Sequence, residues 1–335
     1  MADVIIQDVA KEVNEWVANN KTVVEAGVYS DQIQLNQHCK TLTAIKGKYP
    51  QFHKILNRVV QGFEPIWQEL GQIQFKHKML QNFQQKVNFP FVPEDVLSTW
   101  LAELRVEGKT AQDHPISKHI MEELMAKVID DLDELSQVGT YDALNASGQY
   151  GSSMNGIKTA IDNALVDANH KAFKIPLNAI TPANILDEVK SFEKQLPKKT
   201  RKKIKTLFMS SDLAMEYADQ YEQTYGTKVT YTEDGKMKTP LAKMDIVGLD
   251  YIPDNLIFAT VPGNMVRLID VFDKPAVTKI QELDYEVKVF MDWHLGYDFL
   301  INQLLYVAVF DGSQRGFNDA TQNALYYDSE NLVVV

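Results

Sequence analysis

Residues 203–264 read KIKTLFMSSDLAMEYADQYEQTYGTKVTYTEDGKMKTPLAKMDIVGLDYIPDNLIFATVPGN, and this stretch decides the fold of the chain. Its short apolar run at 204–208 predicts a strand. Ser210 or Ser211 then caps a helix whose apolar residues recur at helical spacing, and Gly226 ends that helix. The stretch therefore begins with a strand that is followed at once by a helix.

Strands dominate the rest of this stretch and the final third of the chain. Asp234 and Gly235 predict the turn of a hairpin. Alternation from Tyr285 to Trp293 places apolar side chains on one face of a long strand. Apolar runs bounded by proline, asparagine and glycine predict further strands at 244–247, 256–260, 265–271 and 304–310. Together with the helices, these strands predict an α+β fold.

The composition limits the classes of protein to consider. The 335 residues are 45% hydrophobic and 24% charged, which is enough apolar material for one large core or two modest ones. The net charge of -11 argues against a protein that coats nucleic acid. A single cysteine, Cys39, excludes an intrachain disulfide and a thiolate zinc cluster. The sequence has no basic leader and no run of 18 apolar residues, so we expect no membrane partner.

The first twenty residues predict an amphipathic helix. Ile6, Val9, Val13 and Trp16 recur at three- and four-residue spacing and share one stripe. The polar side is mostly acidic, which disfavours an anionic membrane surface. We therefore expect this stripe to pack against another protein surface, and we treat its residues as candidate contacts between subunits.

A second candidate contact begins at Gly71. Ile73, Phe75, His77 and Met79 alternate with polar residues that include Lys76 and Lys78. After Gln81 and Asn82 a second extended run covers 84–91, so the pattern predicts a long two-stranded hairpin that also carries Lys86. Because an isolated two-stranded hairpin is marginal in water, this one must lie either on its own domain or on a neighbour.

Helices fill most of the middle of the chain. The pattern predicts a helix over 94–104 and a longer one that starts near Pro115, keeps its apolar repeat to Leu135 and ends at Gly139. Residues 141–156 are rich in Ala, Ser, Asn and Gly and mark a domain boundary. Two further helices are predicted at 154–166 and 182–196, the second with Thr181 as its cap and Pro182 at its first position.

No set of residues predicts catalysis, a cofactor site or a metal site. Residues 151–159 resemble a phosphate loop, but Ile157 separates Gly156 from Lys158, whereas that loop needs lysine directly after glycine. The seven histidines show no metal-ligand spacing. His38 and Cys39 are adjacent in the chain, and adjacent residues rarely form a nucleophile and base pair. We expect no enzymatic activity.

A basic run is the sharpest charge feature. It consists of Lys198, Lys199, Arg201, Lys202 and Lys203, and Lys205 follows it. Such a run can contact nucleic acid or an acidic partner. No aromatic side chain is interleaved for base stacking, so recognition of single strands is disfavoured. The alternative is an ordinary solvated linker.

The order of the predicted elements resembles that of HK97-fold capsid proteins. MNGIKTAIDNAL (154–165), LFMSSDLAMEYADQY (207–221) and NLIFATVPGNM (255–265) are similar to the first helix, the strand-to-helix step and the exit strands of their A-domain. The resemblance covers nearly the whole chain. It implies an N-terminal arm (1–62), an E-loop hairpin (63–92), a P-domain with a long spine helix (93–145), an A-domain (146–272), and closing P-domain strands with a C-terminal tail (273–335).

The resemblance also implies a function and partners. HK97-fold proteins are structural; they self-assemble into pentamers and hexamers of an icosahedral shell around double-stranded DNA, without sequence specificity. We expect a major capsid protein of a tailed bacteriophage that assembles in the bacterial host cytoplasm and resides in the virion capsid. The portal and minor capsid proteins would be its partners, and a separate scaffolding protein would be needed because the chain carries no long charged region ahead of the arm.

Three points stay open from the sequence. Some family members cross-link a hairpin lysine to an asparagine, and Lys76, Lys78 and Lys86 lie in that region, but no spacing identifies their partners and we expect no cross-link. An encapsulin-type nanocompartment shares the architecture and packages protein cargo. An α/β enzyme with an unrecognised site is the alternative from another class.

Overall fold

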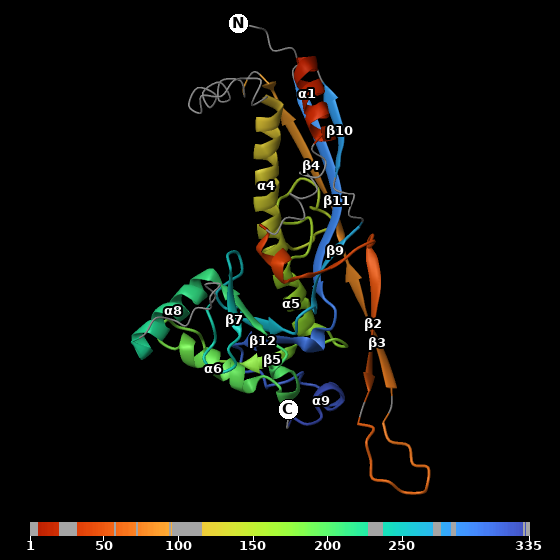
Figure 1. Ribbon diagram of the computed structural model, residues 1–335, viewed down its shortest axis with the longest axis vertical. Helices are drawn as coiled ribbons and strands as arrows, with labels where there is room; N and C mark the ends of the chain where they lie inside the picture. Colours follow the sequence, from red (N-terminus) through yellow and green to blue (C-terminus); the bar gives the residue numbers. More distant parts are fainter. Residues whose placement is uncertain are drawn as a thin grey trace.

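The computed structural model of the chain describes residues 6–19, 32–56, 58–71, 73–93, 95, 116–226, 237–270, 276–282, 286–330 and 332. Figure 1 shows an elongated molecule in which a long helix runs beside two long strands, with a second lobe at one end and a projecting hairpin next to it. Helices and strands are mixed as expected for the α+β class. Residues 94 and 96–104 of the predicted helix, and the turn at Asp234 and Gly235, lie outside the described residues.

The first sheet is built around one long strand, β11. Residues 287–295 of β11 pair antiparallel with β4 on one edge, while residues 287–292 pair with β10 on the other edge and 295–299 with β9. Val287, Val289, Met291 and Trp293 are buried, which confirms the predicted apolar face. The strands of this sheet are β1 (Lys40–Leu42), β4 (Phe83–Phe91), β9 (Met265–Ile269), β10 (Ala276–Glu282) and β11 (Val287–Phe299).

Two helices complete the core of this first lobe. Helix α4 (Ile116–Val138) buries a stripe at helical spacing, which confirms the predicted long helix; the stripe comprises Ile120, Leu124, Val128, Leu132 and Leu135. Helix α1 (Ile6–Asn19) packs against α4 and β10 near the N-terminal end of the molecule (Figure 1). The two helices and the sheet share one hydrophobic cluster.

The second lobe holds its own sheet and its own hydrophobic cluster. The strand order is β5-β12-β8-β6-β7, and helices α6 and α8 pack on it. The strands are β5 (Phe173–Pro176), β6 (Thr206–Ser210), β7 (Asp245–Leu249), β8 (Phe258–Thr260) and β12 (Leu305–Val309). Its helical segments are α6 (Ile185–Gln195), α7 (Lys198–Arg201), α8 (Ser211–Tyr225), α9 (Ala320–Tyr327) and the short η2 (Asn302–Leu304). The remaining segments, α5 (Ile157–Val166) and the short η1 (Gln34–His38), pack against α4 and share the hydrophobic cluster of the first lobe.

Two strands belong to a different lobe from the one that the sequence order suggests. β9 was expected in the A-domain but pairs with β1 and β11 in the first sheet. β12 was expected among the closing strands of the P-domain but lies between β5 and β8 in the second sheet. The chain therefore crosses between the lobes after β8 and crosses back after β11, and only the pairing of distant strands specifies these crossings.

The predicted step from β6 into α8 is confirmed in detail. The Ser210 hydroxyl oxygen accepts a hydrogen bond from the Leu213 backbone N–H at 3.1 Å, and the same hydroxyl donates to Asp254 at 2.6 Å. Gly226 ends the helix in the left-handed conformation, with a φ of 61°. Helix α6, by contrast, begins three residues later than predicted, because Asn184 and not Thr181 occupies its cap position.

Removing the cap of α8 is expected to lower stability measurably. In Ser210→Ala the Leu213 N–H loses its acceptor and Asp254 loses a donor, so the free energy of unfolding should fall by about 1–2 kcal/mol. Thermal or urea unfolding would measure this. The matched control is Ser211→Ala, whose hydroxyl contacts the exposed carboxylate of Asp250 and should cost less. Equal losses for the two variants would contradict the capping role.

The predicted hairpin is wrong in its pairing. β3 (Ile73–Gln81) pairs antiparallel with β2 (Lys48–Leu56), whereas β4 pairs with β11 and not with β3. Asn82, the residue between β3 and β4, is not a turn residue. Its buried side chain accepts from the Gly47 N–H at 2.7 Å and donates to the Ile45 carbonyl at 2.6 Å, which fixes the entry into β2.

Gly296 lets β11 lie close to the backbone at Gln81 and Asn82, where β3 passes into β4. A Cβ atom at position 296 would lie 2.7 Å from the Gln81 carbonyl oxygen and 2.8 Å from the Asn82 Cα. Both are backbone atoms that cannot move aside cheaply. The close approach therefore requires glycine in β11 where β3 passes into β4.

Candidate assembly surface

The β2–β3 hairpin has two faces of opposite character. The register places Phe52 opposite His77, Leu56 opposite Ile73 and Pro50 opposite Met79, so these residues share one face of the ribbon. Lys48 and Gln81 lie at the base of the same face. We call the rest of this face the outer face, and it consists of Pro50, Phe52, Lys54, Leu56, Ile73, Phe75, His77 and Met79. Each of these eight residues is exposed, including Phe52 at 64% and Phe75 at 74%.

The opposite, inner face of the hairpin is mainly polar and is directed at the body of the same chain; it carries Gln51, His53, Gln74, Lys76 and Lys78 beside Tyr49, Ile55 and Leu80. The Lys78 ammonium donates to the Asp298 carboxylate at 2.5 Å, to the Asn302 side-chain oxygen at 2.7 Å and to the Phe299 carbonyl at 2.8 Å. Its three protons thus match three acceptors, and the Lys78 side chain is only 12% exposed. This ion pair holds the base of the hairpin in one orientation.

Two further contacts, one from the inner face and one from a residue just beyond β2, reach α9 and the residue that follows it. The His53 Nε2 lies 2.8 Å from the Tyr326 hydroxyl. The Arg58 guanidinium pairs with Asp328 at 2.5 Å on the surface. A hairpin that only covered its own domain would turn its apolar face inward. Here the polar face is inward and the apolar face is outward, so the apolar face is available to another molecule.

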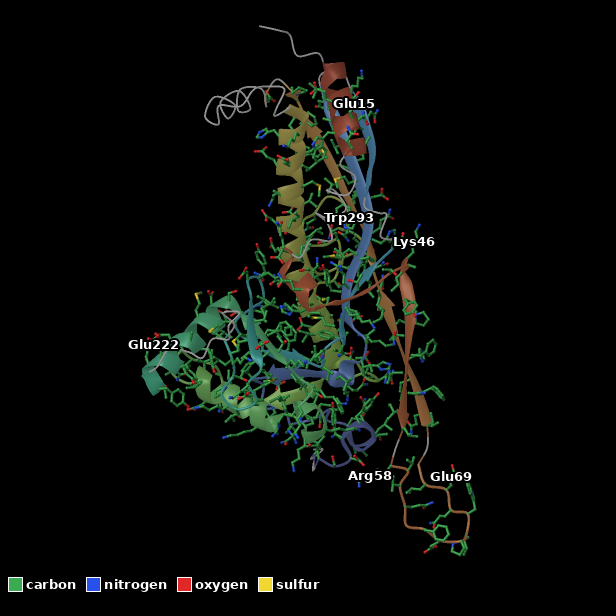
Figure 2. The ribbon with its side chains drawn as sticks, viewed as in Figure 1. Glu15, Lys46, Arg58, Glu69, Glu222 and Trp293 are labelled. Carbon is green, nitrogen blue, oxygen red and sulfur yellow. The ribbon has the colours of Figure 1, made fainter. Side chains whose placement is uncertain are left out.

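Residues 58–70, which connect β2 to β3, continue this apolar surface. Figure 2 shows Arg58 and Glu69 at the far end of the molecule, beyond the paired strands. Phe63 is 95% exposed and Trp67 is 92% exposed, and Val60 and Ile66 are similarly uncovered. We call residues 58–70 the tip. Large aromatic side chains in this position are typical of contact sites between proteins.

Two histidines on the side of the hairpin that faces the body, His53 and His170, have lowered pKa values. Burial lowers the pKa of His53 below its usual value, and the positive charges of His170 and Lys76 lower it further. Burial also lowers the pKa of His170. The negative charge of Asp167 raises this pKa, whereas the nearby Lys78, Lys76 and His77 lower it. The Nδ1 atom of His53 is buried without a hydrogen-bond partner in the described residues, so a proton there would be unsatisfied.

Acidification is therefore expected to loosen the hairpin from the body. Since the pKa of His53 is lower in the folded chain than in the unfolded chain, docking is strongest above about pH 6.5 and weakens as the pH falls below that value. Hydrogen exchange of the β2 and β3 amides, corrected for intrinsic rates, should show faster opening at pH 5 than at pH 7.5. His53→Gln should reduce this pH dependence, while the exposed His77→Gln should change it less.

The structure places the predicted contact residues of the N-terminal helix inside the subunit. Val9 and Val13 are buried against the chain's own core, and Trp16 packs on the same cluster. The expectation that a neighbour covers these three residues is wrong, because α4 and β10 already cover that side of α1. The side chain of Ile6 lies outside the described residues.

The predicted residues of the hairpin divide between its two faces. Ile73, Phe75, His77 and Met79 lie on the outer face, while Lys76 and Lys78 lie on the inner face. Lys78 is therefore corrected from a contact between subunits to an anchor within one subunit. Lys86 lies on β4, is exposed, and donates to the Ser147 hydroxyl at 2.8 Å.

Sequence reasoning missed β2 and the tip. Pro50 within residues 48–56 obscured the strand, although Phe52, Lys54 and Leu56 alternate with more covered residues. The cluster of large apolar residues at 59–67 was the available signal for an exposed contact. The tip separates β2 from β3 in the chain, and the spacing of apolar residues within each strand does not indicate that the two strands pair.

The basic run is partly structural. The Arg201 guanidinium donates to the carbonyls of Lys194 and Leu196 at 2.5 and 2.7 Å and so closes the C-terminus of α6. Arg201 is half-buried, which corrects its assignment as a partner contact. The side chains of Lys198, Lys199, Lys202 and Lys203 are exposed.

The described residues also include histidine, cysteine, lysine and carboxylate side chains outside this surface. Within them, no group of three or more His, Cys, Asp or Glu side chains converges on a point that could hold a metal ion. Burial raises the pKa of the Cys39 thiol to about 12, so little thiolate forms at neutral pH. Lys158 pairs with Asp162 one turn away on α5. No helix in the described part of the chain has the length and apolar character needed to cross a membrane.

Comparison with known proteins gives matches in structure and none in sequence. A comparison with models of protein families and one with curated proteins each find no match. The fold is similar to that of a chain in the procapsid of satellite phage P4, a structure that includes the size determination (Sid) protein. The TM-score is 0.52 at 9% identity, over 84% of this chain and 96% of that one.

Two other solved structures show the same kind of similarity. A chain in the structure of Gordonia phage Cozz matches with a TM-score of 0.50 at 11% identity, over 82% of this chain and 85% of that one. A virus-like particle from Pyrococcus furiosus matches with a TM-score of 0.42 at 10% identity, over 85% of this chain and 98% of that one. The first two matches confirm the expected HK97-like capsid fold.

Proposed function

We propose that this chain is the major capsid protein of a tailed double-stranded DNA bacteriophage and that it self-assembles into the pentamers and hexamers of an icosahedral shell. The observation that carries the proposal is the β2–β3 hairpin, which docks on its own subunit through ions and hydrogen bonds and leaves its apolar face uncovered. A fold shared with a chain of a phage procapsid supports the same conclusion.

The uncovered surface is large enough to support association. Full burial of one large apolar side chain contributes about 1.5–3 kcal/mol. The outer face and the tip together offer many such side chains, among them Phe52, Phe75, Phe63 and Trp67. Association of two proteins costs about 4–15 kcal/mol in lost freedom of motion. Burial of both regions against a neighbouring copy can offset that cost.

The charge distribution fits a wall that encloses DNA without binding it tightly. The net charge is -11, so the chain as a whole repels phosphate. The exposed lysines at 198, 199, 202 and 203 form a local exception and are a candidate contact for DNA or for an acidic partner. A separate scaffolding protein, a portal and minor capsid proteins are the further partners that this role requires. Assembly would take place in the bacterial cytoplasm.

The described residues favour a structural role over catalysis. The nucleophile and base candidates do not meet in a common site: His38 stacks its ring edge-on to Phe208, and the Cys39 thiol is held protonated. The proposal therefore rests on the exposed apolar surface of the hairpin and not on a pocket with reactive groups.

Electron microscopy of the purified protein tests the proposal. We expect closed shells whose diameter fixes the number of copies, together with smaller ring-shaped assemblies. A persistent 38.1 kDa monomer under every assembly condition, with and without co-expressed neighbouring genes, would overturn it. If the shells instead enclose a protein cargo and no DNA, the chain is a nanocompartment shell.

A further inference from the structure

A positively charged surface lies on the second lobe, at the end of α6 and around α7. Within residues 194–205 every exposed side chain is a lysine. The other side chains of this segment are buried or half-buried, and its apolar residues Leu196 and Ile204 belong to the core of the lobe. We call the six exposed lysines the lysine patch, and they are Lys194, Lys198, Lys199, Lys202, Lys203 and Lys205.

The carboxylates that the fold brings to this segment already have partners. Glu330 pairs with Arg315 at 2.8 Å, and Asp245 lies 3.6 Å from Lys238. Glu193 is buried and accepts from two backbone N–H groups. Residues 194–205 themselves contain no aspartate or glutamate. In the part of the chain that the structure describes, the lysines of the patch therefore form no salt bridge, and their charges add to one another.

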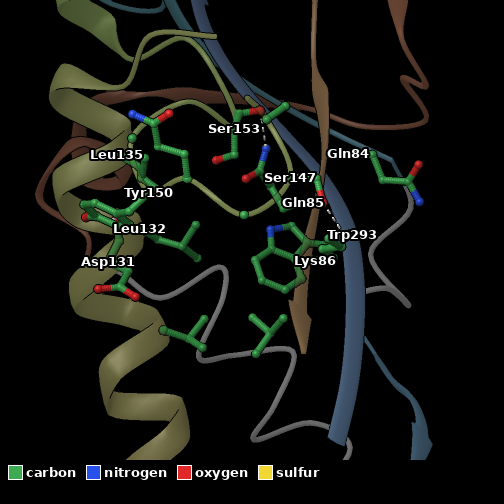
Figure 3. A pocket seen from close by; sticks show the side chains of 16 residues that line it. Gln84, Gln85, Lys86, Asp131, Leu132, Leu135, Ser147, Tyr150, Ser153 and Trp293 are labelled. Atoms are coloured by element: carbon green, nitrogen blue, oxygen red, sulfur yellow. Dashed lines mark hydrogen bonds between the residues drawn. The ribbon is translucent and has the colours of Figure 1, made fainter. Parts of the chain in front are cut away.

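Several other exposed lysines lie beside carboxylates. Lys118, Lys127 and Lys158 each pair with an acidic residue one turn away on the same helix. In Figure 3, Lys86 on β4 and Asp131 on α4 both line the recess between α4 and the first sheet. An anion that approached Lys86 would therefore also meet a negative charge. The lysine patch differs because its own segment supplies none.

The backbone that carries the patch is held in one conformation. Thr200 is buried and accepts a hydrogen bond from the Tyr306 hydroxyl at 2.6 Å, which fixes α7 on β12. The Lys198 backbone N–H donates to Glu330 at 2.7 Å. Arg201 closes the end of α6 through its two bonds to carbonyls. Because this backbone is already ordered, a partner has to immobilise only the lysine side chains.

The patch suits a phosphate backbone better than a protein surface. Interfaces between proteins are depleted in lysine and rely on aromatic or large apolar anchors. Residues 194–205 expose no such anchor. A lysine ammonium binds phosphate as a point charge, and duplex DNA presents one phosphate charge per about 1.7 Å of its axis. Contacts to phosphates carry no information about base sequence.

We infer that the lysine patch binds the phosphate backbone of double-stranded DNA without sequence specificity, and that the face of the second lobe that carries it is turned toward the packaged DNA. Because the chain as a whole is acidic, a local cluster of positive charge orients the subunit relative to the DNA. DNA inside a shell is confined beside the wall, so a weak contact is sufficient. This inference rests on the proposed shell function and adds the surface at which the wall meets its contents.

Binding of a duplex to the unassembled subunit tests the contact. A short fluorescent DNA duplex is titrated with full-length subunit at several salt concentrations, and its anisotropy is recorded. The patch variant carries glutamine in place of Lys198, Lys199, Lys202 and Lys203. We expect its affinity at low salt to fall at least about tenfold, and the slope of log affinity against log salt to become shallower by about 3. Arginine at the same four positions keeps the charge and should preserve binding.

A second fourfold variant is the matched control. Lys11, Lys40, Lys46 and Lys127 are exposed elsewhere on the chain, and their replacement by glutamine changes the net charge by the same amount. This control should keep most of the affinity and of the slope. Equal losses for the two variants, or unchanged affinity in the patch variant, would overturn the inference. Loss of binding to poly-glutamate without loss of binding to the duplex would overturn it in favour of an acidic protein partner.

Acetylation of lysines in assembled shells tests the orientation. Shells that contain DNA and shells from which the DNA has been released are treated with an acetylating reagent, and modified lysines are quantified by mass spectrometry. We expect the patch lysines to react several-fold more slowly in the filled shells, with less change at Lys40 and Lys46. Equal reactivity of the patch in the two samples would show that it does not face the DNA.

The outcomes separate this inference from the proposed function. If shells form and hold DNA while the patch variant binds the duplex normally, only the assignment of the lysine patch fails. If no shells form under any condition, the proposed function fails, and duplex binding by the unassembled subunit and its two variants still decides whether the patch binds DNA.

Discussion

Replacing Phe52 and Phe75 together by aspartate is expected to yield a folded subunit that no longer forms shells. The two side chains are diagonal neighbours on the outer face of the hairpin and make no contribution to the buried core. Stability of the single subunit should therefore change little. In a shell, however, both carboxylates would lie against a neighbour without partners, and each such burial costs several kcal/mol.

Sedimentation velocity and electron microscopy measure this effect. We expect the sedimenting species to shift from shells to the 38.1 kDa subunit, with an unchanged circular dichroism spectrum. The matched control, Phe52→Leu with Phe75→Leu, keeps the surface apolar and should still assemble. Intact shells from the aspartate variant would refute the role of the outer face. Deletion of residues 72–89 is not an equivalent test, because it would remove much of β4 from the first sheet.

Replacing Lys78 by methionine is expected to cause the largest loss of stability. The ammonium neutralises Asp298 in a site where both side chains are mostly buried, and Asn302 and the Phe299 carbonyl depend on the same donor. Removing one partner of a buried ion pair leaves the other charge uncompensated. We expect the free energy of unfolding to fall by about 3 kcal/mol, and the hairpin to detach before the rest of the chain unfolds.

Urea unfolding and hydrogen exchange of β2 and β3 would measure the two effects separately. Lys76→Met is the matched control on the same face, and it should cost much less because Lys76 has no comparable set of acceptors in the part of the chain that the structure describes. The double variant Lys78→Met with Asp298→Leu should recover most of the stability, since no charge is then left unpaired. Equal losses for Lys78→Met and Lys76→Met would show that the ion pair does not anchor the hairpin.

Elements that depend on neighbours along the chain were predictable. The spacing of apolar residues in α4, the alternation in β11 and the capped step from β6 into α8 all appear where the sequence indicates them. Each follows from interactions within a few residues: a side chain that caps an N–H, a glycine that accepts a positive φ, or a periodic apolar stripe. The resemblance to the HK97 fold rested on the order of such elements.

The candidate surface was predicted only in part. Alternation at 73–79 correctly marked one strand with an apolar and a polar side. Which side faces solvent depends on Asp298, Asn302 and Tyr326, which lie more than 200 residues away in the chain. The stripe on α1 shows the opposite case, because its apolar side is already covered by α4 and β10. An amphipathic pattern indicates that a face must be covered and does not identify what covers it.

By itself the sequence determined the class of fold, the position of the long helix and the strand-to-helix step, because short-range hydrogen bonding and side-chain periodicity are local properties. Tertiary structure alone decided that β3 pairs with β2, that β9 lies in the first sheet and β12 in the second, and that the hairpin turns its apolar face outward. Those outcomes depend on the free energy of contacts between distant segments, such as the Lys78 ion pair and the backbone crossing at Gly296, which no local pattern records.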